Sequence, residues 1–192
     1  MAIYCTEAER RQYEEVGYWR SLPQLIPSVI FHRRGVNHLG NYEWIQSTTF
    51  DLFARKRNLI FSLPGAFTPT CSTYQLPDFE QLAPEFYEEG IDHIFCVTVN
   101  DAFVCNAWAD KNDLSDVIVL PDGSGKFTEG MQMLVDKDNI GFGRRSWRYA
   151  AVIDNGKITD WFIEEGKDDN IEEDPYLYTA PDFVLNKLRE SK

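Results

Sequence analysis

Two apolar runs most constrain the fold of this chain: NLIFSL at residues 58–63 and HIFCVTV at residues 93–99. A run of this length that is apolar throughout is typical of a strand buried on both faces of a sheet. Between the two runs, residues 79–87 carry apolar side chains at helical spacing, and Gly90 offers a stop. A strand, a helix and a second strand in this order predict a sheet with helices packed against it.

The chain repeats this alternation elsewhere. Short apolar runs at 28–31 and 117–120 predict further strands, and the turn PDGSG ends the second of them. Asp101 is a good N-cap for another helix. Its inward-facing side chains are expected to be Phe103, Val104, Ala107 and Trp108.

Two prolines and a hairpin turn interrupt this alternation of strands and helices. In the helical stretch, Pro77 is expected to begin a new first turn and Pro84 to kink the helix or shift its start, because proline lacks the N–H group of a helix interior. Asn155-Gly156 predicts a tight turn between two apolar-rich strands, and residues 180–190 form an amphipathic helical pattern.

Together these elements predict an α/β sandwich: a central mixed β-sheet flanked by helices, with a C-terminal β-hairpin and helix. We expect one domain at residues 25–192, preceded by an arm at residues 1–24 whose role the sequence leaves open.

Charge and composition exclude several functions. The formal net charge of −12 argues against nucleic acid or an anionic membrane as the main partner. The sequence holds no apolar run long enough to span a bilayer and no secretory signal at its start, so we expect a soluble, cytoplasmic protein.

The motifs for metal, phosphate and calcium binding are incomplete. His32, His38 and His93 show no metal-ligand spacing. DGSGKFT and DKDNIG lack required positions of a phosphate loop and a calcium loop, and the acidic run at residues 164–174 is interpreted as a solvated loop.

The segment PGAFTPTC, which follows the first long apolar run, draws attention to Cys71. Thr68 is a good N-cap and Pro69 suits the first helical position, which places Cys71 third in the first turn. Its sulfur would then lie near unpaired backbone N–H groups. Because a thiolate and not a thiol is the nucleophile, a reactive cysteine here also needs a cationic neighbour in this acidic chain.

One cluster of arginines can provide that cation. GRRSWRY contains Arg144, Arg145 and Arg148. Arg148 leads directly into the strand YAAVI and is the one able to project from the edge of the sheet toward Cys71. Arg144 and Arg145 are open to a different interpretation, as solvated side chains or partners of acidic neighbours.

These residues resemble the peroxiredoxin signature, in which a proline, a threonine and the peroxide-reacting cysteine follow one another as Pro64, Thr68 and Cys71 do here. The resemblance is closest to the type II (peroxiredoxin 5) subfamily, especially the peroxiredoxin module of bacterial peroxiredoxin–glutaredoxin hybrids. It extends from about residue 25 to the end through VTVNDAFVCNAW, PDGSGKFTEGM, GFGRRSWRYA and EEDPYLYTAPDFVLNKL. It implies a thioredoxin-like fold and assigns the active-site arginine of the family to Arg148.

The resemblance implies a thiol-dependent peroxidase for hydrogen peroxide and organic hydroperoxides. Cys71 would become a sulfenic acid, Arg148 would stabilise the thiolate and the peroxide oxygens, Thr68 would contribute its hydroxyl, and Pro64 would limit water. No metal or organic cofactor is needed. The subfamily often forms dimers through the face of the active-site loop, so a homodimer is expected.

The sulfenic acid must then be reduced by another thiol. The resolving cysteine that animal relatives carry before the last helix is missing from EEDPYLYTAPDF. Cys96, in an apolar strand, and Cys105 favour packing roles, whereas Cys5 and Cys105 stay open as resolving thiols. We therefore expect a one-cysteine cycle with glutathione and glutaredoxin, and thioredoxin as the second candidate.

Two further hypotheses accompany this cycle. Arg144 or Arg145 beside the pocket would attract the glutathione anion. A non-enzymatic alternative is a redox-dependent binding protein or holdase on the same fold, whereas a thioredoxin-type disulfide oxidoreductase is disfavoured because the chain contains no CxxC.

Overall fold

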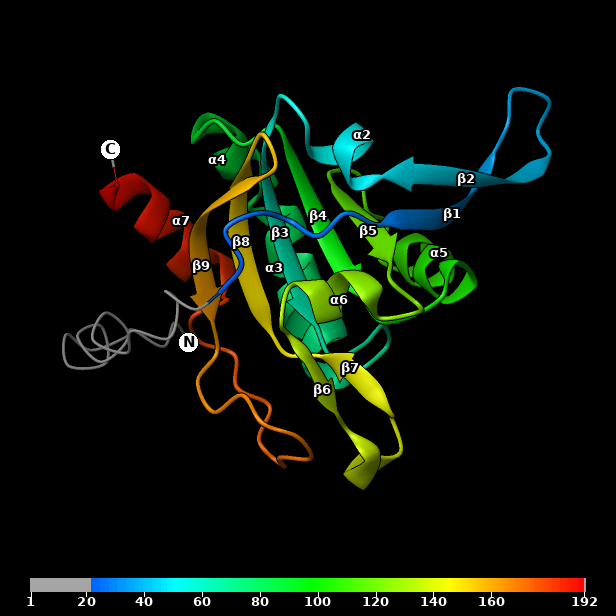
Figure 1. The fold of residues 1–192 in the computed structure, drawn as a ribbon. Helices are drawn as coiled ribbons and strands as arrows, with labels where there is room; N and C mark the ends of the chain where they lie inside the picture. Colours follow the sequence, from blue (N-terminus) through cyan, green and yellow to red (C-terminus); the bar gives the residue numbers. More distant parts are fainter. Residues whose placement is uncertain (1–21, 192) are drawn as a thin grey trace.

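A computed structural model of the protein describes residues 22–191; Cys5 and all of the predicted arm before residue 22 lie outside this part. Its centre is a five-stranded sheet in the order β5-β4-β3-β8-β9 (Figure 1). The strands are β3 (Arg57–Leu63), β4 (His93–Thr98), β5 (Val117–Pro121), β8 (Tyr149–Asp154) and β9 (Lys157–Ile163). β3, β4 and β5 run parallel, whereas β8 is antiparallel to both β3 and β9. The prediction of a mixed sheet is confirmed.

The central strand β3 is buried on both faces, as its apolar sequence predicts. Leu59, Phe61 and Leu63 belong to one core and Ile60 to the other, and all four side chains are fully buried. The first core lies under α3 (Leu76–Gln81), α4 (Ala83–Glu88) and α7 (Pro181–Glu190), and the second under α2 (Thr49–Phe53) and α6 (Lys126–Gly130), on the opposite side of the sheet (Figure 1). Alternate side chains of β3 therefore pack against the helices on both sides of the sheet.

Several local signals act as predicted. α4 begins one residue before Pro84, which lies in its first turn, so this proline shifts the start of the helix. Asn155 and Gly156 both have positive φ, at 49° and 81°, as the tight hairpin turn between β8 and β9 requires. Asp101 caps α5 (Ala102–Lys111) by accepting hydrogen bonds from the N–H groups of Phe103 and Val104.

The predicted inward face of α5 was right for Trp108 but wrong for Phe103 and Ala107, which are exposed. The buried residues are Ala102, Cys105 and Trp108. These three residues recur at a spacing of three, so the packed face of α5 is shifted from the predicted one. The indole Nε1 of Trp108 donates to the Ser72 hydroxyl of the neighbouring helix at 3.0 Å.

Two small hairpins lie outside the central sheet. Of the predicted strand at 28–31, only the last two residues belong to β1 (Ile30–Val36), which extends further and pairs antiparallel with β2 (Tyr42–Thr48). β6 (Leu134–Asp136) and β7 (Arg144–Ser146) form the second hairpin, with the 3-10 turn η3 (Asp138–Ile140) between them. Within residues 22–191, no helix has the length and apolar character needed to cross a membrane.

The first core depends on a stack of aromatic rings between β3 and α3. The ring centroids of Phe61 and Phe79 are 4.0 Å apart at an interplanar angle of 10°, and Phe79 also stacks on Phe86. We predict that Phe79→Ala lowers the free energy of unfolding by about 3–5 kcal/mol, because it leaves a cavity in a fully packed layer. Urea denaturation measures this change. The control Phe50→Ala, at a side chain 74% exposed, should change it by less than about 1 kcal/mol, and similar losses in both variants would contradict this account of the core.

Candidate active site

The loop that joins β3 to the following helix is tightly constrained. The Thr68 hydroxyl donates to the Gly65 carbonyl oxygen at 2.8 Å, and the Ala66 N–H donates to Asn100 Oδ1 at 3.0 Å. Phe67 has φ 63°, a conformation that a bulky side chain rarely adopts. The loop is therefore held both by its own residues and by Asn100 at the end of β4.

The helix that carries Cys71 begins as predicted and then widens. Residues 69–70 are α-helical, Cys71 is the third residue, and Cys71–Gln75 form the π-helix η2, which runs on into α3. The Leu76 N–H bonds to the Cys71 carbonyl oxygen five residues back. Pro77 follows directly, and the widened turn accommodates it because its ring would clash with the carbonyl of an ordinary α-turn.

A buried guanidinium contacts the sulfur of Cys71. Arg148 Nη1 lies 3.6 Å from Cys71 Sγ, and each residue is only 1% exposed. The sheet brings them together, because Tyr149 at the start of β8 pairs with Ser62 at the end of β3. Arg148 precedes that pair and Cys71 follows it, so both lie at the same end of the two strands.

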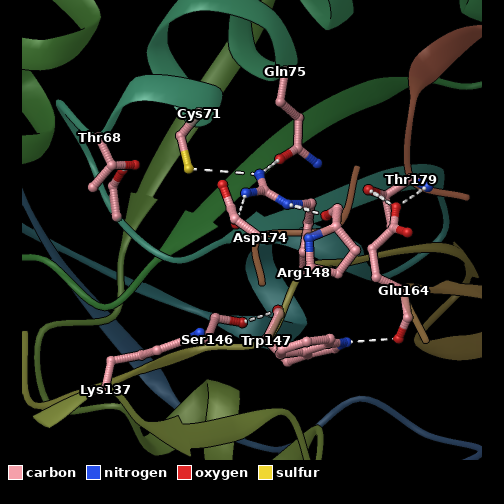
Figure 2. Close-up of polar contacts among 12 residues, drawn as sticks. Thr68, Cys71, Gln75, Lys137, Ser146, Trp147, Arg148, Glu164, Asp174 and Thr179 are labelled. Atoms are coloured by element: carbon pink, nitrogen blue, oxygen red, sulfur yellow. Dashed lines mark hydrogen bonds and ion pairs between the residues drawn. The ribbon is translucent and has the colours of Figure 1, made fainter. Parts of the chain in front are cut away.

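Three further acceptors hold the Arg148 side chain (Figure 2). Nη1 also donates to Gln75 Oε1, Nη2 donates to Asp174 Oδ1, and Nε donates to the Pro175 carbonyl oxygen at 3.0 Å. Burial alone lowers the pKa of this guanidinium, but the nearby Cys71 and Asp174 outweigh it, so the pKa lies above its ordinary value. Arg148 therefore stays charged although it is buried.

Asp174 and Pro175 reach Arg148 from the loop at residues 164–180, called here the C-terminal loop. Glu164, 2% exposed, anchors it by accepting a hydrogen bond of 2.8 Å from the Leu177 N–H. It accepts two more of 2.8 Å from the Thr179 N–H and hydroxyl (Figure 2). Asn170 accepts two bonds of 3.0 Å from Asn139, one from its backbone N–H and one from its side-chain amide. The interpretation of residues 164–174 as a solvated loop is thus wrong at Glu164, which is buried. Asp174 is exposed as expected, and its carboxylate also pairs with Arg148.

The other arginines of the cluster have different partners. Arg144 is 61% exposed and forms ion pairs with Glu129 at 3.6 Å and Asp136 at 3.9 Å. Arg145 donates to the Val99 carbonyl oxygen, and its guanidinium lies over the Phe142 ring, 5.6 Å from the centroid. Neither makes the contact with Cys71 that Arg148 makes.

The remaining described cysteines are buried without a cation beside the sulfur. Cys96 is fully buried in β4, and desolvation, followed by the nearby Cys105 and Cys71, raises its pKa well above the usual range. Burial, together with Asp101, raises the pKa of Cys105 to about 12, and its sulfur donates to the Asn100 carbonyl oxygen at 3.7 Å. Both groups stay thiols at neutral pH.

Sequence reasoning missed Gln75 and Asp174. Gln75 is fully buried, and its Nε2 has no partner among the described residues. The one available signal was general: an arginine placed in a buried site needs acceptors for five N–H hydrogens, so side chains near it in the fold must supply them. Neither position can be selected by that signal without the fold.

Comparisons with known proteins identify the family of this chain. Residues 43–178 match the family model described as Redoxin. The chain is 52% identical over 173 residues to a peroxiredoxin of Rhizobium etli, covering 88% of this chain and 97% of the relative. It is 44% identical to the hybrid peroxiredoxin hyPrx5 of Haemophilus influenzae, covering 85% of this chain and 64% of that protein.

A solved structure gives the same result. The crystal structure of the Plasmodium falciparum antioxidant protein, a 1-Cys peroxiredoxin, superimposes with a TM-score of 0.82 at 35% identity, covering 86% of this chain and 98% of that one. The predictions of a thioredoxin-like fold and of a peroxiredoxin are confirmed. The chain belongs to the redoxin family, and within it to the peroxiredoxins, which are thiol peroxidases, of the type II (peroxiredoxin 5-like) subfamily.

Proposed function

We propose that Cys71 is the peroxide-reacting cysteine of this thiol peroxidase and that Arg148 is its catalytic cation. The observation that carries the proposal is the 3.6 Å contact between Cys71 Sγ and Arg148 Nη1 in a site closed to bulk water. A guanidinium at this distance favours the thiolate, which is the nucleophilic form. Hydrogen peroxide and organic hydroperoxides are the substrates.

In the first step the Cys71 thiolate attacks the terminal oxygen of the peroxide. An S–O bond forms, the O–O bond breaks, the sulfur loses two electrons to the peroxide, and the leaving oxygen takes a proton to become water or an alcohol. The product on the protein is a sulfenic acid. Negative charge moves from sulfur to the leaving oxygen during this displacement, so donors aimed at the peroxide oxygens accelerate it.

Arg148 has one donor to offer. A guanidinium carries five N–H hydrogens, and its four bonds to Cys71, Gln75, Asp174 and the Pro175 carbonyl leave one on Nη2 for a peroxide oxygen. Thr68 already donates its hydroxyl hydrogen to Gly65, so it acts toward the peroxide as an acceptor of the O–H hydrogen. Half-buried Pro64 limits the access of water.

We predict that Arg148→Lys lowers the second-order rate constant for hydrogen peroxide by about 10²–10³-fold, because lysine keeps the charge but loses the fixed donor geometry. Stopped-flow fluorescence of the pre-reduced protein measures the rate. Arg189→Lys, at an exposed arginine paired with Glu85 and Glu89, is the matched control and should change the rate by less than about twofold. Equal rates for the two variants would remove Arg148 from the catalytic role.

We further propose a one-cysteine cycle in which glutathione condenses with the sulfenic acid and glutaredoxin then reduces the mixed disulfide. The burial and raised pKa values of Cys96 and Cys105 support it, because resolution needs an accessible thiolate. Thioredoxin as reductant is the alternative. Three buried, unpaired thiols also fit the reducing cytoplasm.

Intact-mass analysis after one equivalent of hydrogen peroxide distinguishes these cycles. We predict the gain of one oxygen atom at Cys71 and, with glutathione added, conversion to a glutathione mixed disulfide. Cys71→Ser should show neither product. Loss of two hydrogen atoms without added thiol would instead identify a disulfide with Cys5, Cys96 or Cys105 and contradict the one-cysteine cycle. A single oxidation without turnover would favour a binding or holdase role.

We propose that Arg144 or Arg145 attracts the glutathione anion. Their places in β7, four and three residues before Arg148, support this role. The double variant Arg144→Gln/Arg145→Gln is predicted to raise the KM for glutathione about threefold or more at low salt, with a smaller effect on the KM for peroxide. The single variant Arg144→Gln leaves the Val99 contact of Arg145 intact and serves as control for folding. Equal changes in both KM values would exclude this role.

We also propose that the protein is a homodimer through the face of the active-site loop. Phe67 in that loop is 48% exposed, and the Lys111 ammonium of α5 lies 5.7 Å from the centre of its ring. An exposed aromatic side chain held in a constrained loop is a favourable anchor for a partner surface.

A further inference from the structure

Arg148 lies between two groups that carry negative charge. Its Nη1 contacts Cys71 and its Nη2 pairs with Asp174, and Figure 2 shows both side chains pointing toward the guanidinium. Cys71 and Arg148 are buried, whereas the Asp174 side chain retains 46% of its exposure. Of these three groups, the Asp174 carboxylate is the one that faces solvent.

The charges of this cluster do not cancel when the site is reactive. The Cys71 thiolate and the Asp174 carboxylate carry one negative charge each, and Arg148 carries one positive charge, which leaves the cluster at −1. A buried guanidinium alone is a strong binder of anions. With Asp174 on Nη2, an approaching substrate meets a carboxylate beside the remaining donor, in surroundings where burial strengthens electrostatic forces.

We propose that Asp174 is a specificity-determining residue that makes the site select neutral peroxides over anionic ones. The inference rests on the roles proposed above for Cys71 and Arg148. Hydrogen peroxide and alkyl hydroperoxides are neutral and approach without an electrostatic penalty. Peroxides that carry a negative charge next to the O–O bond are repelled by the exposed carboxylate and by the cluster behind it.

The C-terminal loop keeps Asp174 in this position. Glu164 holds the loop at residues 177 and 179, and the two bonds that Asn139 donates to Asn170 hold it on the other side of Asp174. The Pro175 carbonyl accepts from Arg148 Nε. The carboxylate therefore does not need its own charge to stay near the guanidinium. Asparagine at this position has nearly the same shape and still offers an oxygen to Nη2, so Asp174→Asn removes the charge while preserving the acceptor.

The test compares two small peroxides, hydrogen peroxide and the anion peroxymonosulfate, in stopped-flow reactions with the pre-reduced full chain. The quantity is the ratio of the rate constant for peroxymonosulfate to that for hydrogen peroxide. Any change in the thiolate fraction of Cys71, or in the placement of Arg148, affects both reactions and cancels to first order in this ratio. We expect Asp174→Asn to raise the ratio about tenfold at low salt.

Glu172→Gln is the matched control, because it removes the same charge from an exposed residue of the same loop and changes the net charge equally. We expect the ratio of its two rate constants to stay within about twofold of the ratio for the unsubstituted protein. Added salt should speed the peroxymonosulfate reaction of the original protein and have a smaller effect on Asp174→Asn, since screening weakens a repulsion that the variant lacks.

Three outcomes would overturn the inference in distinguishable ways. An unchanged ratio, with both rates reduced equally in Asp174→Asn, would make Asp174 a positioning residue only. An equal rise in Glu172→Gln would assign the selectivity to the overall charge of the protein. If the original protein reacts with hydrogen peroxide no faster than an ordinary cysteine, the proposed function itself fails and the selectivity proposal falls with it.

Discussion

Burying the charge of Arg148 is the constraint on which the rest of this site depends. A guanidinium removed from water needs acceptors for its N–H groups and a compensating negative charge, since an unpaired buried charge is strongly destabilising. Here the acceptors come from two separate parts of the chain: the helix after β3, which supplies the Cys71 sulfur and Gln75, and the C-terminal loop, which supplies Asp174 and the Pro175 carbonyl. The site is therefore complete only when these parts are folded together.

Each part of the fold near the site can be understood from this requirement. The antiparallel register of β3 and β8 sets Arg148 at the end of the strand from which the Cys71 loop leaves. The π-helical turn carries Cys71 and Gln75, both of which contact Nη1 of the guanidinium, and Pro77 makes an ordinary α-turn unfavourable there. Glu164 uses its buried carboxylate to hold the loop that brings Asp174 back over the same side chain.

The sequence allows the framework to be predicted better than these contacts. β3 and β4 are apolar throughout because they are buried on both faces, and this signal can be read from the local sequence. The threonine and proline that mark the start of the Cys71 helix are local signals too. The buried face of α5 is set by its packing against distant parts of the chain, which the local pattern does not contain, so Phe103 and Ala107 were placed wrongly. Asp174 lies in an acidic run whose composition indicates solvent, and only the tertiary structure shows that its partner is Arg148. From the residues alone, Arg148 was one of three candidates, and the family resemblance selected it.

Comparison of the three described cysteines shows what burial does and does not explain. Cys71, Cys96 and Cys105 are all almost fully inaccessible, and for the last two burial opposes ionisation. What separates Cys71 is the guanidinium beside its sulfur, and in a chain of net charge −12 an exposed guanidinium is readily paired with carboxylates. Arg144 pairs with Glu129 and Asp136, and Arg189 with Glu85 and Glu89. Among residues 22–191, burial of Arg148 keeps such competing carboxylates away from it and admits a single one, Asp174, which pairs with Nη2 and not with the Nη1 that contacts the sulfur. An acidic protein can in this way keep one cation dedicated to one thiol.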